Sequence, residues 1–172
     1  MTDGSSIKRE TKLEFNGFSL PAKSLDSLNQ NLSEFEKNVV DFAREWLSGK
    51  STFEFQTSGS TGTPQKIKFS RVQIEASVRL TQQTFQLEKN QKALLCLDPG
   101  FVAGKMMIVR ALEIGMDLLC IPPTANPLAE ITGDPPIDFA ALVPYQLNAI
   151  FSSRADTEKL NGIKKIIVGG SS

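Results

Sequence analysis

The chain has 172 residues, and its 19 lysine and arginine residues balance 19 aspartate and glutamate residues, so the formal net charge is zero. This length allows one domain with a real hydrophobic core, and without a basic tract the chain gives no indication of nucleic-acid binding. The sequence contains no histidine, which excludes a Ser-His-Asp triad, a Cys-His pair and a His-ligated zinc site within this chain.

The N-terminal segment, MTDGSSIKRE, is polar and lacks the apolar core of a signal peptide. No apolar run in the chain approaches the roughly 18 residues of a membrane span. Cys96 and Cys120 lie far apart in apolar, strand-like runs, where we expect buried reduced thiols rather than a disulfide. Together these features predict a cytoplasmic protein that binds neither a membrane nor nucleic acid.

The first part of the chain, residues 1–52, is expected to be an N-terminal extension with one amphipathic helix. Ser33 and Glu36 have the spacing of a capping box, in which each side chain bonds to the other residue's backbone. Apolar residues then recur at helical spacing until Gly49, which favours the end of a helix.

Two short alternating runs follow, TFEFQT and KIKFS, and each predicts a strand. Between them lies a loop dominated by serine, threonine and glycine. Ser70 and Gln73 form a second capping box, which predicts a helix directly after the second strand.

The remainder of the chain alternates between predicted strands and helices, and the expected order is strand ALLCL, helix GKMMIVRALEI, strands MDLLCI and DFAALV, helix PYQLNAIFSS and strand IKKIIVGG. Such alternation predicts an α/β fold with a largely parallel sheet covered by helices. The proline-rich PPTANPLAEITGDPPI is expected to be a surface loop. Within the second helix, Arg110 and Glu113 are spaced i, i+3 and are expected to pair.

The loop in FEFQTSGSTGTPQKIKFS, Phe53 to Ser70, has more hydrogen-bonding capacity than a turn needs. Backbone N–H groups in such a turn form a concave anion site, glycines allow close approach, and Lys66 adds a positive charge. The Walker A and G-x-G-x-x-G patterns do not fit, because Gly59 and Gly62 are the only glycines in the loop. On composition alone, a solvated surface loop is the simpler interpretation.

The order of the residues favours the anion site, because TSGSTGTPQK resembles the phosphate-binding signature T-S-G-[ST]-T-G-x-P-K of the adenylate-forming (AMP-binding) enzymes. Gln65 stands where the family usually has lysine, and Lys66 follows one place later. The residues that match in order are Thr57, Ser58, Gly59, Ser60, Thr61, Gly62 and Pro64.

Later segments resemble the same family. In CLDPGFVAGKMMIVRALEIGMDLLCI, Phe101 takes the place of the histidine and Gly104 that of the glycine in the family's L-P-x-F-H-x-x-G segment. AALVPYQLNAIF is similar to its V-P-x-x-L segment, and IKKIIVGGSS is similar to its strand before a G-G-x-P-like turn. Among these enzymes, the compact loops and short N-terminal part are most similar to the o-succinylbenzoate–CoA ligases of menaquinone synthesis.

The resemblance implies a two-step ligation that uses Mg²⁺-bound ATP, a small carboxylic acid and coenzyme A. Residues Thr57 to Lys66 would hold the β- and γ-phosphates, and Gly169, Gly170 and Ser171 would border the nucleotide. Phe101, Gly104, Lys105 and Tyr145 are expected to contact the acid. Lys105 could pair with a carboxylate of the acid, or it could be a solvated lysine at a helix end.

No catalytic residue and no metal ligand is assigned within residues 1–172. The family's Thr-Glu segment, its ribose-binding aspartate and its catalytic lysine would all follow Ser172. We therefore expect an incomplete N-terminal, ATP- and acid-binding domain that is inactive alone, without the rest of the large domain and the small C-terminal domain. A domain cut in this way would expose apolar surface that favours self-association into a homo-oligomer.

Three alternatives to an acid–CoA ligase stay open from the sequence. The first is an adenylating enzyme that loads a carrier-protein thiol instead of coenzyme A. The second is a non-catalytic phosphate- or nucleotide-binding module, and the third is an interaction protein whose loop caps an anionic surface of a partner.

Overall fold

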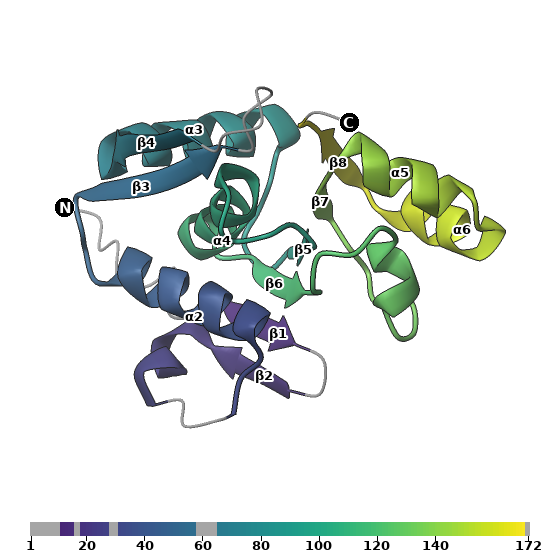
Figure 1. Ribbon diagram of the computed structural model, residues 1–172, viewed down its shortest axis with the longest axis horizontal. Helices are drawn as coiled ribbons and strands as arrows, with labels where there is room; N and C mark the ends of the chain where they lie inside the picture. The colour runs from purple at the N-terminus through teal and green to yellow at the C-terminus, as the bar shows by residue number, and fades with distance from the viewer. Residues whose placement is uncertain (1–10, 16–17, 28–30, 58–64, 171–172) are drawn as a thin grey trace.

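The computed structural model describes residues 11–15, 18–27, 31–57 and 65–170, and its centre is a six-stranded sheet (Figure 1). The strand order is β2-β1-β6-β5-β7-β8, and every neighbouring pair is parallel except β1 and β2. The strands are β1 (Lys12–Phe15), β2 (Phe18–Pro21), β5 (Lys92–Leu95), β6 (Asp117–Cys120), β7 (Phe139–Leu142) and β8 (Lys165–Val168). The prediction of an α/β fold with a largely parallel sheet is confirmed.

Helices cover both faces of this sheet. Their bounds are η1 (Ala22–Ser27), α2 (Glu34–Leu47), α3 (Arg71–Phe85), α4 (Val102–Ile114), η2 (Pro127–Glu130), α5 (Pro144–Phe151) and α6 (Arg154–Gly162). Alternate residues of β5 enter two separate cores: Ala93 and Leu95 pack with the side of α2, α3 and α4, and Leu94 packs with the side of α5 and α6. A strand that is buried on both faces explains why ALLCL is continuously apolar.

Helix α4 lies between β5 and β6 in the chain and is covered in turn by α2 and α3 (Figure 1). Most of its residues are buried, which agrees with a sequence that is apolar nearly all round. The few charged residues of α4 are therefore candidates for a role other than packing. Two of them, Lys105 and Arg110, border hollows in the surface.

Both predicted capping boxes are present. The Ser33 hydroxyl accepts a hydrogen bond from the Glu36 backbone N–H, and the Ser33 backbone N–H donates to the Glu36 carboxylate at 2.7 Å. Ser70 and Gln73 make the equivalent pair of hydrogen bonds at the start of α3. Pro144 begins α5, as predicted.

The two strands that flank the serine-, threonine- and glycine-rich loop form a hairpin outside the main sheet. β3 (Thr52–Thr57) pairs with β4 (Gln65–Ser70) in antiparallel fashion through six residue pairs. Figure 1 shows this hairpin beside α3 and α4, apart from the six-stranded sheet.

Five elements of the fold were not predicted: β1, β2, η1, η2 and α6. η2 lies in the proline-rich segment that was expected to be a surface loop, and its Pro127 and Leu128 are buried. β1 and β2 are only four residues long, so their alternation is too brief to separate from chance, and the partner of β1 in the sheet is β6, about a hundred residues away in the chain. α6 buries only Asp156 and Leu160, so it has a weak apolar face. The strands show that the expected N-terminal extension contributes to the same sheet as the rest of the chain.

Cys96 and Cys120 are free and buried, as predicted. Burial raises the pKa of the Cys96 thiol to about 12, so this thiol is protonated at neutral pH. Among the described residues, no helix is both long enough and apolar enough to cross a membrane.

Candidate functional site

A pocket of about 370 Å³ opens where strands of the main sheet end and α4 begins. Its wall contains Leu142 at the end of β7 and Gly169 and Gly170 directly after β8. Phe101, which precedes α4, and Gln56 of β3 close it from the other side. The carboxyl ends of parallel strands are the usual ligand-binding edge of an open α/β sheet.

The hairpin is joined to this pocket by its backbone. Gln56 forms a parallel β-bridge with Phe101, so the end of β3 lies against the turn that starts α4. Buried Phe53 and Phe55 also pack their rings against Phe42 of α2, with ring centroids 6.2 and 6.1 Å apart. The strand that leads into the predicted phosphate loop is thus held at the rim of the pocket.

The predicted phosphate loop itself is only partly within the described residues. Thr57 ends β3, and Lys66 lies near the start of β4, directly opposite Gln56. The Lys66 amine forms an ion pair with the Glu54 carboxylate at 2.9 Å, and the hydrogen bond and charge of Lys66 lower the pKa of Glu54. Residues 58–64 of the loop lie outside the described residues, and so does Ser171 of the predicted nucleotide edge. The predicted binding residues among them are Ser58, Gly59, Ser60, Thr61, Gly62 and Ser171.

Gly104 lies beneath the pocket wall, in the first turn of α4. A Cβ atom at this position would lie 2.3 Å from the carbonyl oxygen of Asp98 and 2.8 Å from the backbone nitrogen of Pro99. Only glycine allows the helix to approach the preceding turn this closely. Gly104 therefore sets the position of Phe101 and of the residues that line the pocket.

Arg110 is the residue of the pocket whose importance the sequence interpretation missed. Its Nε atom is buried and has no hydrogen-bond partner among the described residues, and its Nη1 atom lies 3.7 Å from the Met107 sulfur, a weak acceptor. Burial lowers the pKa of Arg110 to about 10. The expected pair with Glu113 is not formed: Glu113 instead accepts a 2.7 Å hydrogen bond from the indole N–H of Trp46.

A guanidinium with no anionic partner is costly in an apolar wall, because a charge taken out of water needs compensation. The sequence did carry a signal for this residue. Arg110 is the only charged residue between Lys105 and Glu113 in an otherwise apolar helix. A lone cation in a buried helix beside a pocket is a candidate partner for an anionic ligand.

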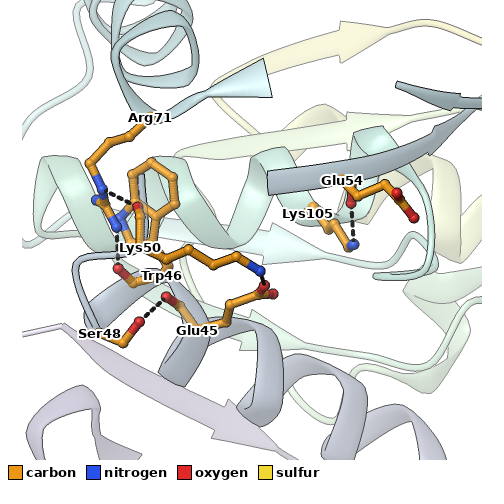
Figure 2. A network of polar contacts seen from close by, with 7 residues as sticks. All are labelled: Glu45, Trp46, Ser48, Lys50, Glu54, Arg71 and Lys105. Carbon is orange, nitrogen blue, oxygen red and sulfur yellow. Dashed lines mark hydrogen bonds and ion pairs between the residues drawn. The ribbon is translucent and has the colours of Figure 1, made fainter. Parts of the chain in front are cut away.

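Lys105 and Tyr145 do not line this pocket. The Lys105 amine donates a 3.0 Å hydrogen bond to the carbonyl oxygen of Glu54, and Figure 2 shows it reaching from α4 to β3. It borders a second hollow whose wall includes Asp41 and Glu45. Tyr145 lies in the first turn of α5 with 63% of its surface exposed. The structure thus gathers Phe101, Gly169 and Gly170 around one pocket and leaves these two elsewhere.

The described residues contain no group of three or more acidic, cysteine or histidine side chains that could hold a metal ion. What the described site offers is an apolar pocket, one partly buried cation, and an exposed glycine turn at the ends of parallel strands.

Comparison with protein families matches residues 26–172 to the AMP-binding enzyme family. A comparison with curated proteins found no match. Among solved structures, an acyl-CoA synthetase (AMP-forming)/AMP-acid ligase II-like protein from Dyadobacter fermentans is 34% identical, with a TM-score of 0.80. The match covers 88% of this chain and 43% of that protein, so the chain spans less than half of this relative's length.

Two more distant structures share the fold. One is o-succinylbenzoate coenzyme A synthetase (MenE) from Bacillus subtilis, in complex with ATP and a magnesium ion. It is 14% identical, with a TM-score of 0.55, and the match covers 68% of this chain and 24% of that protein. The other is the N-terminal subdomain of Klebsiella oxytoca NpsA, in complex with 3-hydroxybenzoyl-AMSN. It is 23% identical, with a TM-score of 0.56, and the match covers 69% of this chain and 30% of that protein.

The family match extends over most of the chain, and the Dyadobacter protein adds sequence identity to the similarity of fold. This chain belongs to the family of AMP-binding enzymes.

Proposed function

We propose that the full-length protein is an AMP-forming acid–CoA ligase that activates a small carboxylic acid with Mg-ATP. The observation that carries this proposal is the pocket shared by Phe101, Gly169 and Gly170, beside the hairpin whose loop has the phosphate-binding sequence. The pocket would contribute an apolar wall for the acid. The hairpin leads into the loop that would supply hydrogen-bond donors to the phosphate oxygens.

The reaction that this arrangement supports has two steps. A carboxylate oxygen of the acid bonds to the α-phosphorus of ATP, and the bond to the bridging oxygen breaks, which gives acyl-AMP and pyrophosphate. A thiolate sulfur then bonds to the acyl carbon and releases AMP, with coenzyme A as the expected thiol. Positioning and charge stabilisation supply most of the acceleration in such transfers, so the absence of histidine is no obstacle.

The residues of this chain would act by binding and orienting the reactants. Backbone N–H groups and hydroxyls of the loop, Thr57 to Lys66, would hold the leaving pyrophosphate. The glycines after β8 have no side chains to block a planar group at the rim of the pocket, and Gly170 has a backbone conformation (φ +95°) that favours glycine. The apolar wall of α4 would exclude water from the acyl group.

Arg110 supports an acid that carries a second anionic group. Its guanidinium is partly buried in the pocket wall, with no ion pair among the described residues. A carboxylate that enters the pocket would supply the missing partner, in the planar geometry that arginine favours. o-Succinylbenzoate, a dicarboxylate of menaquinone synthesis, has this chemistry, and a cytoplasmic enzyme of that pathway is the specific form of the proposal.

The test is product analysis with the purified full-length protein, ATP, magnesium, coenzyme A and o-succinylbenzoate. We expect AMP, pyrophosphate and a CoA thioester. 4-Oxo-4-phenylbutanoate, which lacks the ring carboxylate, is the matched acid and should react with a much higher KM. Equal KM values for the two acids would remove the role of a second carboxylate. Formation of acyl-AMP without a CoA thioester would indicate another thiol acceptor, such as a carrier protein.

A further inference from the structure

The β3–β4 hairpin depends on few backbone contacts for its position. The Arg71 backbone N–H donates to the Ser51 carbonyl at 2.8 Å, but this bond only closes the open end of the hairpin itself, whereas near the loop end Gln56 forms the bridge with Phe101. Because the hairpin is not a member of the main sheet, side chains must fix the stretch of β3 between these points.

Lys105 supplies a contact in that stretch. Its amine donates to the Glu54 carbonyl oxygen at 3.0 Å (Figure 2). The same nitrogen lies 5.0 Å from the ring centroid of Phe42 and 5.5 Å from that of Phe55. The acceptor is a backbone atom of β3. The bond therefore holds the path of the strand and does not depend on the rotamer of a partner side chain.

A lysine at this place is not explained by helix stability. The first turn of a helix carries a partial positive charge, so a cation there is unfavourable. Lys105 is also half-buried, and this burial lowers the pKa of its amine. The carbonyl and the two ring faces compensate for the lost hydration. An apolar residue would pack beside Phe42 and Phe55 without this conflict, so the charged group is retained for the bond to Glu54.

The turn of α4 that holds Lys105 has two sides. Phe101, Val102 and Met106 line the pocket, whereas Lys105 faces away from it and reaches β3. One helical turn is thus in contact with the proposed acid pocket and with the strand that leads into the phosphate-binding sequence. A displacement of β3 from this turn would change the distance between the two binding regions.

We infer that Lys105 is a positioning residue that fixes the phosphate-binding hairpin against the first turn of α4, so that its loss impairs the use of ATP and pyrophosphate more than binding of the acid. The acid pocket contacts β3 only through Gln56, and the backbone bridge from Gln56 to Phe101 still holds that contact. This inference rests on the proposed function. It differs from a direct contact with the acid, because the amine is already bonded to β3 and is not part of the pocket wall.

The experiment uses the full-length protein and Lys105→Met, which keeps the unbranched side chain as far as Cε and removes the ammonium group. Acid-dependent ATP–pyrophosphate exchange gives separate KM values for ATP, pyrophosphate and the acid. The KM values for ATP and pyrophosphate should rise about tenfold, the effect of one lost charge-assisted hydrogen bond, with less than about a twofold change for the acid. Lys105→Arg, which retains a cation and donors, should recover ATP use to within about threefold of wild type.

Lys50→Met is the matched control. Lys50 also lies over an aromatic ring, with its amine 5.8 Å from the Phe53 centroid, and it pairs with Glu45, but it makes no side-chain bond to β3 in the described structure (Figure 2). This variant should leave all three KM values unchanged while its melting temperature changes about as much as that of Lys105→Met. Should Lys105→Met fail to fold, Lys105→Leu, which also lacks a hydrogen-bond donor, provides the same comparison.

The outcomes are distinct. A rise in KM for the acid alone would overturn the inference and return Lys105 to a role in acid binding. Equal increases in the KM values for ATP, pyrophosphate and the acid, without recovery in Lys105→Arg, would show a merely structural role. That result would also overturn the inference. If wild-type protein shows no acid-dependent exchange, the proposed function fails first, and that result is separate from any effect of the variants.

Discussion

Gln56 of β3 and Phe101, the residue before α4, form a parallel β-bridge, although they are 45 positions apart in the chain. The bridge joins the hairpin that flanks the phosphate-binding sequence to the helix that lines the pocket. Two segments with no obvious relation in the sequence therefore meet at one edge of the fold.

Replacement of Arg110 by methionine should weaken binding of the acid without lowering the stability of the fold. The variant should raise the KM for a dicarboxylic acid by about 10- to 100-fold, because one charge-assisted contact is lost. Its melting temperature should be equal to or higher than that of wild type, because a partly buried cation without an ionic partner is removed. Arg79→Met, at an exposed position on α3, is the control and should change neither quantity. A large loss of stability in Arg110→Met would indicate a structural role.

Replacement of Ser60 and Thr61 together by alanine should weaken the use of ATP. We expect a loss of about 2–4 kcal/mol in total, taking each charged hydrogen bond as about 1.5–3 kcal/mol and allowing partial replacement by water. ATP–pyrophosphate exchange in the full-length protein measures this loss. Ser51 and Thr52, a hydroxyl pair at the opposite end of β3, serve as the control when both are changed to alanine. Unchanged exchange in the Ser60 and Thr61 variant would remove the loop from phosphate binding.

Gly104→Ala should be strongly destabilising. The new Cβ atom would lie 2.3 Å from a backbone oxygen, so helix α4 or the preceding turn must move. We expect a loss of about 3 kcal/mol in the free energy of unfolding, measured with denaturant. Gly162→Ala, where nothing lies within 4 Å of the added atom, should be neutral. A stable Gly104→Ala variant with a normal KM for the acid would show that this close approach is not needed.

Asp138 should make stability depend on pH in the acid range. Burial raises the pKa of its carboxyl, but hydrogen bonds from the Lys164 amine at 2.7 Å and the Lys92 backbone N–H at 2.8 Å outweigh this effect, so the pKa lies below its ordinary value of 3.8. A lowered folded-state pKa means that the carboxylate stabilises the fold above pH 3.8, and that this contribution is lost as the pH falls through the lower folded value.

Asp138→Asn should therefore lower the free energy of unfolding at neutral pH by about 1 kcal/mol, a modest figure because Lys164 is largely exposed. The difference from wild type should shrink below pH 3.8. Asp134→Asn, in the exposed part of the preceding loop, should show no such difference. A constant difference at all pH values would exclude the charge of Asp138 as the cause.

The elements that were predicted correctly from the sequence depend on local signals. The capping boxes at Ser33 and Ser70 involve residues three positions apart, and the hairpin strands alternate over five or six residues. β1 and β2 could not be predicted, because their stability comes from β6 and from the buried side chains of Leu13 and Phe15, and not from a local pattern. α6 was missed because a polar helix with two buried residues has almost no periodic signal.

The candidate site shows the same division. Phe101, Gly169 and Gly170 were selected through family resemblance, and the fold brings them to one pocket, although their binding roles stay predictions. The partner of Lys105 is a backbone carbonyl, which no side-chain pattern can reveal. Arg110 was assigned to a local i, i+3 pair, but Trp46, 67 positions before Glu113, donates to that carboxylate instead.

The proposed function is tested most directly by the identity of the products when the purified full-length protein is mixed with Mg-ATP and a carboxylic acid. We expect AMP and pyrophosphate in amounts that depend on the acid, together with exchange of labelled pyrophosphate into ATP. ADP and phosphate as the products, or AMP formation at the same rate without any acid, would contradict it.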